Sequence, residues 1–222
     1  MKKVVIVPIK AQSERVVGKN FRIVNDKPLY RFLLDKLPET NFDEIYIDSD
    51  SDEIKEYCKK MGFFFIERKL ELTSKSANGN DLLNYHHQLI ESDLYFQMFV
   101  TSPLLTTESM NNCIQLLESS IEHDSIMTVK FLHTWFWFKG SPVNYDPKAL
   151  PRSQDSNPIV METTGLYGIT DHSLRLHKAR VGSNPYFFEV SNFESVDIDD
   201  EFDFNYLNFL LNHPDFDFDS ER

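Results

Sequence analysis

The chain has 222 residues, of which 41% are hydrophobic and 14% aromatic, and its formal net charge is −12. This composition excludes an intrinsically disordered protein and is sufficient for one large domain with a substantial core. Ten acids and one arginine follow residue 193, so the negative charge is concentrated at the C-terminal end and disfavours nucleic acid or an anionic membrane as partner. Two cysteines without paired spacing indicate a reduced, cytoplasmic protein without a structural disulfide or zinc site. We expect no signal peptide and no membrane span, because the chain enters its first predicted strand almost at once and no apolar stretch approaches roughly 18 residues.

Short apolar runs alternate with helical segments along most of the chain. Strands are predicted at residues 3–9, 44–48, 63–66, 95–100, 125–129, 159–169 and 187–190, and helices at residues 28–37, 52–61, 81–91, 107–119 and 201–211. The helix at 52–61 should end at Gly62, and Thr106 or Thr107 should open the helix at 107–119. This alternation predicts right-handed crossovers and a largely parallel sheet in an α/β fold.

The alternation breaks at residues 131–158, which contain two tryptophans and two phenylalanines in succession at 135–138. Such a segment is either a β excursion over the sheet or an exposed apolar arm that docks on a second subunit, and we favour the arm. No internal repeat or linker is visible, so we expect a single domain over residues 1–212 followed by a loose acidic tail at 213–222.

A cationic loop at residues 8–22 follows the first predicted strand. The first 27 residues carry seven Lys or Arg and two acids, although the whole chain is acidic. Open α/β sheets bind phosphorylated ligands at such a position, because small residues let backbone N–H groups approach a phosphate and spaced cations reach several phosphates. The cations of this loop are Lys10, Arg15 and Lys19, and its small residues include Ala11, Ser13 and Gly18. The alternative interpretation of this loop is a solvated basic turn. Neither the P-loop pattern G-x-x-x-x-G-K-[ST] nor the dinucleotide-binding pattern G-x-G-x-x-G occurs in the sequence.

A run of acids at residues 197–203 is the second chemical feature. If Val196 and Ile198 form the buried face of a strand, Asp197 and Asp199 lie together on its opposite face. Carboxylates with bridging phosphate oxygens are ligands that Mg²⁺ prefers. The alternative is that Asp199 or Asp200 caps the following helix and the other acids are solvated.

Other polar residues give weaker indications. Arg152 could hold a substrate carboxylate, or could simply pair with Asp155 on the surface. Arg68 follows the third predicted strand, where it could meet a base or a phosphate. Asp48 and Asp50 lie at the end of the second strand, on the side where a nucleotide would bind.

The histidines do not form a metal-binding pattern. His86 and His87 are adjacent on a predicted helix and therefore diverge around it, so core or surface roles are expected for both. No Ser-His-Asp order and no cysteine motif supports nucleophilic hydrolysis.

Six motifs in order resemble the acylneuraminate cytidylyltransferase family, the CMP-sugar-acid synthetases. Its phosphate loop is similar to residues 8–20 (PIKAQSERVVGKN), and further motifs are similar to residues 26–29 (DKPL), 48–51 (DSDS), 101–105 (TSPLL) and 152–155 (RSQD) and to the pair Asp197 and Asp199. The resemblance covers about 210 residues. It implies a GT-A-like or Rossmann-like three-layer fold with a mostly parallel central sheet, and a homodimer built through a protruding arm at 131–158.

The resemblance also implies a reaction, a cofactor and roles for residues. CTP and a sugar acid would give a CMP-sugar acid and pyrophosphate with Mg²⁺, for surface-glycan synthesis. Lys10, Arg15 and Lys19 would offset charge on the pyrophosphate, and Asp197 and Asp199 would hold the metal. The implied nucleotide-binding residues are Ala11, Ser13, Asn20, Asp50 and Arg68, and the implied substrate-binding residues are Phe99, Arg152, Gln154 and Thr164.

The sequence departs from the family pattern mainly on the acceptor side. Lys10 stands for the usual arginine, Phe99 for a glutamine, Leu105 for an arginine and Thr164 for an asparagine. A site without polar partners for acceptor hydroxyls discriminates them poorly. The acceptor therefore stays open between a sialic-acid-like nonulosonate, a Kdo-like acid and a phosphonate. A transferase using a nucleotide sugar as donor and a non-catalytic nucleotide-binding relative are the other interpretations.

Overall fold

The computed structural model describes residues 1–13, 16–74 and 77–213. Its centre is a seven-stranded sheet in the order β11-β7-β10-β6-β1-β4-β5. The strands are β1 (Lys3–Ile9), β4 (Glu44–Ser49), β5 (Phe64–Glu67), β6 (Leu94–Met98), β7 (Ser125–Leu132), β10 (Ile159–Thr170) and β11 (Pro185–Glu189). Only β10 is antiparallel to its neighbours β6 and β7, so the predicted, mostly parallel sheet is confirmed.

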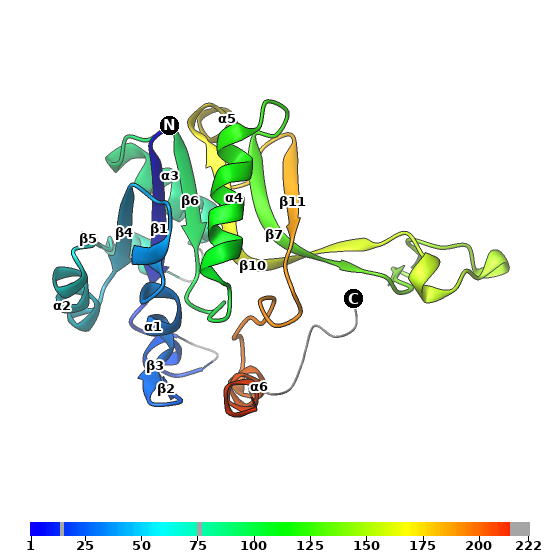
Figure 1. Ribbon diagram of the computed structural model, residues 1–222, viewed down its shortest axis with the longest axis horizontal. Helices are drawn as coiled ribbons and strands as arrows, with labels where there is room; N and C mark the ends of the chain where they lie inside the picture. Colours follow the sequence, from blue (N-terminus) through cyan, green and yellow to red (C-terminus); the bar gives the residue numbers. More distant parts are fainter. Residues whose placement is uncertain (14–15, 75–76, 214–222) are drawn as a thin grey trace.

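Of the six helices in the described residues, five cover the two faces of this sheet, whereas the last lies below it and packs with the first in a separate cluster (Figure 1). The helices are α1 (Leu29–Leu34), α2 (Asp52–Met61), α3 (Gly79–Leu89), α4 (Thr107–Ser119), α5 (Asp171–His177) and α6 (Glu201–Asn212). Alternation along β1 divides the core between the faces. Val5 and Val7 pack in one cluster with α1, α2 and α4, while Val4 and Ile6 pack in another with α3 and α5. The result is the expected three-layer α/β arrangement.

Local signals in the sequence fix several element ends. Thr106 caps α4 by accepting a hydrogen bond from the Ser109 amide, and Gly62 ends α2 with a φ of 76°, which a glycine adopts without a Cβ clash. The helix predicted at 28–37 is wrong in length: α1 ends at Leu34, and a 3₁₀ turn follows at Leu37–Glu39. Pro38 explains the early end, because proline has no backbone N–H to donate to the Leu34 carbonyl oxygen and so cannot continue the α-helical ladder.

Two further differences concern the second half of the chain. Helix α5 was not predicted, since its seven residues are too few for a clear helical period. Residues 192–195 form a turn, and residues 196–199, which we expected to form a strand, belong to none. Val196 and Ile198 are nevertheless buried, and the Ile198 amide donates to the Thr101 carbonyl oxygen over 2.8 Å, so the expected alternation persists without a sheet neighbour.

An arm protrudes from the body at the ends of β7 and β10 (Figure 1). It includes the short strands β8 (Trp137–Phe138) and β9 (Ser141–Pro142), which pair with each other as a small separate sheet. Its shape is the predicted arm at 131–158 and not an excursion folded over the sheet. Its indole and phenyl groups are largely exposed, with Trp137 57% and Phe138 65% accessible.

Candidate functional site

A cavity of about 290 Å³ lies where the carboxyl ends of the central strands meet. Strands β1, β4, β5 and β6 run in one direction, so the residues that follow them converge at one sheet edge. The cavity is lined by one residue of β1, by side chains from the segments after β1, β5 and β6, and by one residue of α3. The lining residues are Pro8, Lys10, Gln12, Ser13, Lys19, Asn20, Arg68, Leu82, Phe99, Val100 and Thr101. The structure thus brings together six of the predicted site residues, which are Lys10, Ser13, Lys19, Asn20, Arg68 and Phe99.

Lys19 joins the loop after β1 to the acidic segment near the C-terminus. Its side chain is buried, and its ammonium group donates to the Ile198 carbonyl oxygen over 2.7 Å and lies 3.6 Å from Asp199 Oδ1. The Asn20 amide donates to the Lys10 carbonyl oxygen over 2.9 Å and so holds the loop in shape. Arg15, predicted beside them, lies outside the described residues.

Ala11 and Asp50 have a structural contact with each other. The Ala11 amide donates to Asp50 Oδ1 over 2.7 Å, and neither residue lines the cavity. That amide is therefore occupied, although we expected it to be directed at a phosphate. The hydrogen bond fixes the loop after β1 to the loop after β4.

Arg68 belongs to a buried ionic network beneath the cavity. It donates through Nε to Asp48 Oδ1 over 2.5 Å and through its terminal nitrogen to the Asp48 carbonyl oxygen over 3.1 Å. His86, on α3, contacts the other Asp48 oxygen through Nε2, and both side chains are fully buried. Burial works to raise the pKa of Asp48, but the hydrogen bond from His86 and the charge of Arg68 outweigh it, and the net shift is downward.

This network corrects one prediction and sharpens another. Asp48 does not face a ligand, because its carboxylate is completely engaged by Arg68 and His86. Of the core and surface roles expected for His86, the structure shows the core role, but its acidic partner lies 38 residues away and gave no sequence signal. Arg68 has a guanidinium fixed at the cavity wall.

Asp197 lies next to this cavity, and the pKa of its carboxyl is raised. Burial raises the pKa of its carboxyl, and the nearby charge of Asp199 adds to the shift, although hydrogen bonds from Thr101 and Thr164 oppose it. The Thr164 hydroxyl donates to Asp197 Oδ2 over 2.8 Å from a left-handed backbone with φ of 56°, at the irregularity in β10. Asp197 Oδ1 is buried and has no hydrogen-bond partner among the described residues.

The pair Asp197 and Asp199 fits a divalent cation. A buried carboxylate oxygen without a donor, beside a second carboxylate, is the arrangement that a hard cation completes. Within residues 1–13, 16–74 and 77–213 no group of three or more His, Cys, Asp or Glu could hold a metal. Mg²⁺ keeps water and substrate phosphates in its coordination shell, so two protein carboxylates are sufficient for it.

Asp200 has the capping role that we considered for this run of acids. Its side chain accepts hydrogen bonds from the Phe202 and Asp203 amides, and the Asp203 carboxylate accepts one from the Asp200 amide, which forms a capping box at the start of α6. The interpretation of the run as one cap and two possible metal ligands is consistent with this geometry.

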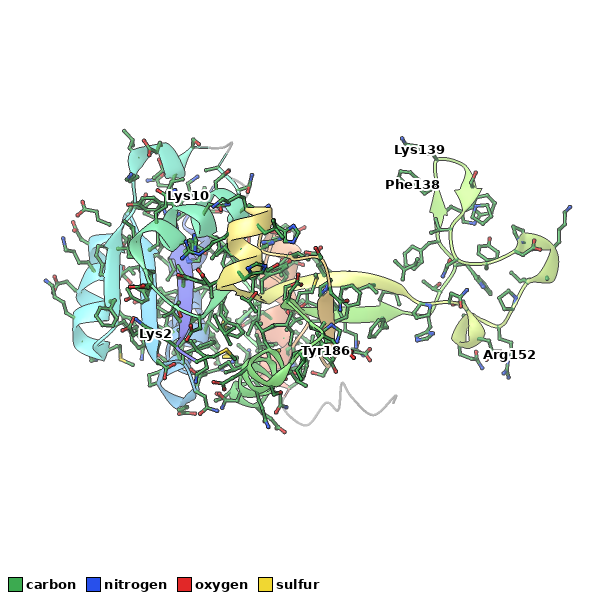
Figure 2. The ribbon with its side chains drawn as sticks, turned by 90° about the horizontal axis from the view of Figure 1, so that it is seen from above. Lys2, Lys10, Phe138, Lys139, Arg152 and Tyr186 are labelled. Atoms are coloured by element: carbon green, nitrogen blue, oxygen red, sulfur yellow. The ribbon has the colours of Figure 1, made fainter. Side chains whose placement is uncertain are left out.

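Two predicted substrate-binding residues lie away from the cavity of their own chain. Arg152 and Gln154 are on the arm, and Figure 2 shows Arg152 far from Lys10. Arg152 pairs with Asp155 through two contacts of 2.6 and 3.1 Å, as the surface interpretation proposed. Within one chain these two residues cannot contact a ligand at the sheet edge.

Sequence reasoning missed Arg180, in the loop between α5 and β11. Its guanidinium lies 3.7 Å from the centre of the Tyr167 ring and 6.0 Å from that of Phe99, which lines the cavity. A lone arginine in a loop has no local pattern, so only the tertiary structure reveals this position.

A mostly parallel sheet with a cationic cavity at the carboxyl ends of its central strands is the architecture of a nucleotide-binding α/β protein. The chain belongs to the cytidylyltransferase family, whose sequence model matches residues 4–195.

Several relatives have 21–25% sequence identity to the chain. An N-acylneuraminate cytidylyltransferase of Streptococcus agalactiae serotype III (strain NEM316) is 25% identical over 217 residues, covering 92% of this chain and 52% of the relative. That of Oncorhynchus mykiss is 24% identical over 89% of this chain and 48% of the relative. A 3-deoxy-manno-octulosonate cytidylyltransferase of Rickettsia bellii (strain OSU 85-389) is 21% identical over 83% of this chain and 78% of the relative. The chain spans about half the length of the N-acylneuraminate relatives it matches.

Solved structures share the fold. A CMP:2-keto-3-deoxy-manno-octonic acid synthetase complexed with CTP superposes with a TM-score of 0.71 at 14% identity, covering 96% of this chain and all of that one. A 4-diphosphocytidyl-2C-methyl-D-erythritol synthase from Anaerococcus prevotii DSM 20548 gives 0.69 at 12% identity, covering 95% of this chain and 96% of that one. Among the described residues, no helix combines the length and apolar character that crossing a bilayer requires.

Proposed function

We propose that this protein transfers CMP from CTP to a sugar acid and releases pyrophosphate. The observation that carries the proposal is the cavity at the sheet edge, which Lys10 and Lys19 line and where Lys19 also lies beside the acids Asp197 and Asp199. Cations and a carboxylate pair are what a nucleoside triphosphate and its metal need together. The named activities of the relatives and the CTP bound in a solved structure of the same fold agree with it.

In this proposal a hydroxyl of the acceptor attacks the α-phosphorus of CTP. A phosphorus–oxygen bond to the acceptor forms, the bond to the β-phosphate oxygen breaks, pyrophosphate leaves and the hydroxyl proton passes to solvent. Lys10 and Lys19 offset the charge that accumulates on the leaving group, and Arg15 adds to them. Asp197 and Asp199 would hold Mg²⁺, which when bound neutralises phosphate oxygens.

The acceptor in this proposal is a sialic-acid-like nonulosonate, and the product serves surface-glycan synthesis. Relatives that act on N-acylneuraminate match more of this chain than the 3-deoxy-manno-octulosonate enzyme does. A Kdo-like acid is the second candidate, supported by that enzyme and by the CMP:2-keto-3-deoxy-manno-octonic acid synthetase of the same fold. The apolar Phe99 in the cavity wall leaves fewer polar partners for acceptor hydroxyls and keeps a phosphonate among the candidates.

We also propose that two copies associate through the arm. Trp137 and Phe138 project from the body on a two-stranded ribbon that is too small to bury them itself. A second copy would cover these rings, and its arm would bring Arg152 and Gln154 toward the cavity that they cannot reach within their own chain.

The test is pyrophosphate release with CTP, Mg²⁺ and a panel of N-acetylneuraminate, 3-deoxy-manno-octulosonate and small phosphonates, with ATP, GTP and UTP as controls. CTP-dependent release with one acceptor supports the proposal and names the substrate. Transfer of a sugar from a nucleotide sugar, with no release of pyrophosphate, would show that the protein is a glycosyltransferase and not a cytidylyltransferase of this kind. CTP binding without turnover across the panel would identify a non-catalytic relative instead.

A further inference from the structure

Arg180 is a partly enclosed cation that the reaction proposed above does not use. Only 26% of its side chain is accessible, because the guanidinium lies over the ring of the fully buried Tyr167, with its carbon 3.7 Å from the ring centre. It enters from the loop between α5 and β11, and the Arg180 amide is held by the Asn80 side chain over 3.0 Å. Stacking on an aromatic ring fixes the plane of a guanidinium and leaves its N–H edge open.

That N–H edge lacks hydrogen-bond partners in the part of the chain that the structure describes. The nearest acid is Glu162, whose Oε2 lies 3.6 Å from the Arg180 terminal nitrogen, beyond hydrogen-bond range. Glu162 Oε2 instead accepts a hydrogen bond of 2.5 Å from the Tyr167 hydroxyl. A guanidinium has five donors, and leaving them unpaired while three quarters of the side chain is enclosed is unfavourable unless a ligand or water completes them.

The space beside Arg180 is kept open by Gly79, the first residue of α3. A Cβ at that position would lie 2.9 Å from a terminal nitrogen of Arg180 and 3.2 Å from Gln97 Oε1. Gln97 Oε1 is buried and has no hydrogen-bond partner among the described residues. The corner therefore contains guanidinium donors open to a ligand or water, a buried acceptor without a partner among the described residues and a glycine that leaves room for the arginine.

This corner adjoins the cavity through Phe99. Phe99 lines the cavity and lies 6.0 Å from the Arg180 guanidinium carbon, measured to the ring centre. Lys10 and Lys19 come from the segment after β1, whereas Arg180 comes from the loop between α5 and β11. Two cationic groups on separate elements indicate two anionic ligand groups.

We propose that Arg180 binds the carboxylate of the acceptor and so determines that the acceptor is an acid. The inference rests on the proposed cytidylyl transfer and names the residue that selects its second substrate. A planar guanidinium donates two parallel N–H bonds to a carboxylate, which is stronger and more specific than contact with a single point charge. The stack on Tyr167 holds the guanidinium in place before the ligand arrives.

The experiment combines one change in the protein with one change in the ligand. KM for the acceptor, KM for CTP and kcat are measured for wild type and Arg180→Gln, with the best acid of the panel and with its methyl ester. Arg180→Gln should raise the acceptor KM about 10- to 100-fold and leave the CTP KM within about twofold, because a charged hydrogen-bonded pair is lost. With the wild type, the methyl ester should show a similar rise in acceptor KM. With Arg180→Gln, the ester should show almost no further rise, because the ester and the substitution remove the same interaction.

Three further variants separate this role from a structural one. Arg175→Gln removes an arginine of α5 that is 63% exposed and paired with Asp171, and it should change none of the constants. Arg180→Lys should raise the acceptor KM less than Arg180→Gln does. Gly79→Ala should raise the acceptor KM without removing any charge, because its methyl group displaces the guanidinium. Far-ultraviolet circular dichroism and thermal unfolding establish that each variant is folded.

The outcomes are distinct from those that test the proposed function. A wild type without CTP-dependent pyrophosphate release on any acid overturns the transfer reaction and this inference with it. An active wild type whose acceptor KM is unchanged by Arg180→Gln overturns the inference alone. A rise in the CTP KM with an unchanged acceptor KM would show that Arg180 binds a nucleotide phosphate. If the effects of the ester and of Arg180→Gln on the acceptor KM were additive, the acceptor carboxylate would bind elsewhere.

Discussion

The ammonium group of Lys19 donates a hydrogen bond of 2.7 Å to the carbonyl oxygen of Ile198, 179 residues further along the chain. Ile198 lies between Asp197 and Asp199, so this bond fixes the cationic loop after β1 to the acids before α6. The loop and the acids are the two features that the proposed reaction requires at one place. Lys19 therefore has a positioning contact and a charge directed at the same site.

Replacing Lys19 by methionine should reduce kcat/KM for CTP about 10²- to 10³-fold, because a preorganised positive charge near the leaving group is lost. Lys19→Arg should have a kcat/KM for CTP between those of the wild type and Lys19→Met, since a guanidinium keeps the charge but differs in shape from an ammonium group. Pyrophosphate release measures both. Lys2→Met is the matched control: Lys2 is a surface lysine paired with Glu44 outside the cavity, and its loss should leave turnover unchanged. Equal activity of the Lys19 and Lys2 variants would refute the phosphate-binding role.

Asp197→Asn should lower turnover and raise stability at the same time. The pKa of this carboxyl is raised, mainly by burial, so between its ordinary value and the raised value the native state holds more protons than the unfolded state. The free energy of unfolding therefore falls as pH rises through that window, and at neutral pH the ionised carboxylate is unfavourable. The neutral amide removes this cost and keeps an acceptor for the Thr164 hydroxyl.

The measurements for Asp197→Asn are thermal unfolding without metal or nucleotide at pH 7 and pyrophosphate release with CTP and Mg²⁺. We expect a higher Tm than wild type and a loss of turnover of about 100-fold or more. Asp203→Asn, which weakens the capping box of α6, is the contrasting variant and should lower the Tm. A lower Tm for Asp197→Asn would contradict the interpretation of that carboxylate as a group held ready for a cation.

His86 should stabilise the Arg68–Asp48 pair beneath the cavity. His86→Phe removes a hydrogen-bonding partner of a fully buried carboxylate and should cost about 1–3 kcal/mol in the free energy of unfolding, and His86→Gln, which retains an N–H group, should lose less. Asp48→Asn leaves the Arg68 charge buried without its counter-ion, and about 3–5 kcal/mol should be lost.

Urea denaturation across pH tests this network. The lowered pKa of Asp48 means that its contribution is present above the ordinary carboxyl pKa and is lost as pH falls through the lowered value. Wild type and Asp48→Asn should therefore converge in stability toward strongly acidic pH and differ most at neutral pH. A constant difference at every pH would show that the loss comes from packing and not from the charge.

The fold could be predicted largely because its signals are local. The apolar run of β1, the Thr106 cap of α4 and the Gly62 end of α2 each lie within a few residues of the element they define. The cationic loop after β1 and the acids before α6 could be singled out for the same reason, since small residues, cations and acids are grouped in the sequence. Their meeting at one sheet edge followed from the parallel order of the strands.

The missed parts of the site depend on contacts between distant segments. His86 meets Asp48 across 38 residues, and Arg180 reaches the Tyr167 ring from a loop with no pattern of its own. Arg152 shows the opposite case: its sequence motif suggested a place in the site, but the arm carries it away from the body of its own chain. A sequence motif gives the chemistry of a side chain, whereas the position of that side chain depends on the tertiary structure and on any second copy.

The arm gives the last prediction, on assembly. Trp137 and Phe138 are exposed on β8 of the arm, and a second copy that covers them would contribute apolar burial worth about 25 cal/mol for each Å². The double variant Trp137→Ser, Phe138→Ser should shift the protein from dimer to monomer in light scattering coupled to size exclusion. Ile121→Ser, at a 99% exposed position on the body after α4, is the control and should leave the dimer intact. If the arm of one copy also brings Arg152 to the other's cavity, the monomeric double variant should lose turnover while still binding CTP. A wild type that is monomeric at micromolar concentration, or a double variant that remains a fully active dimer, would remove the arm from the assembly.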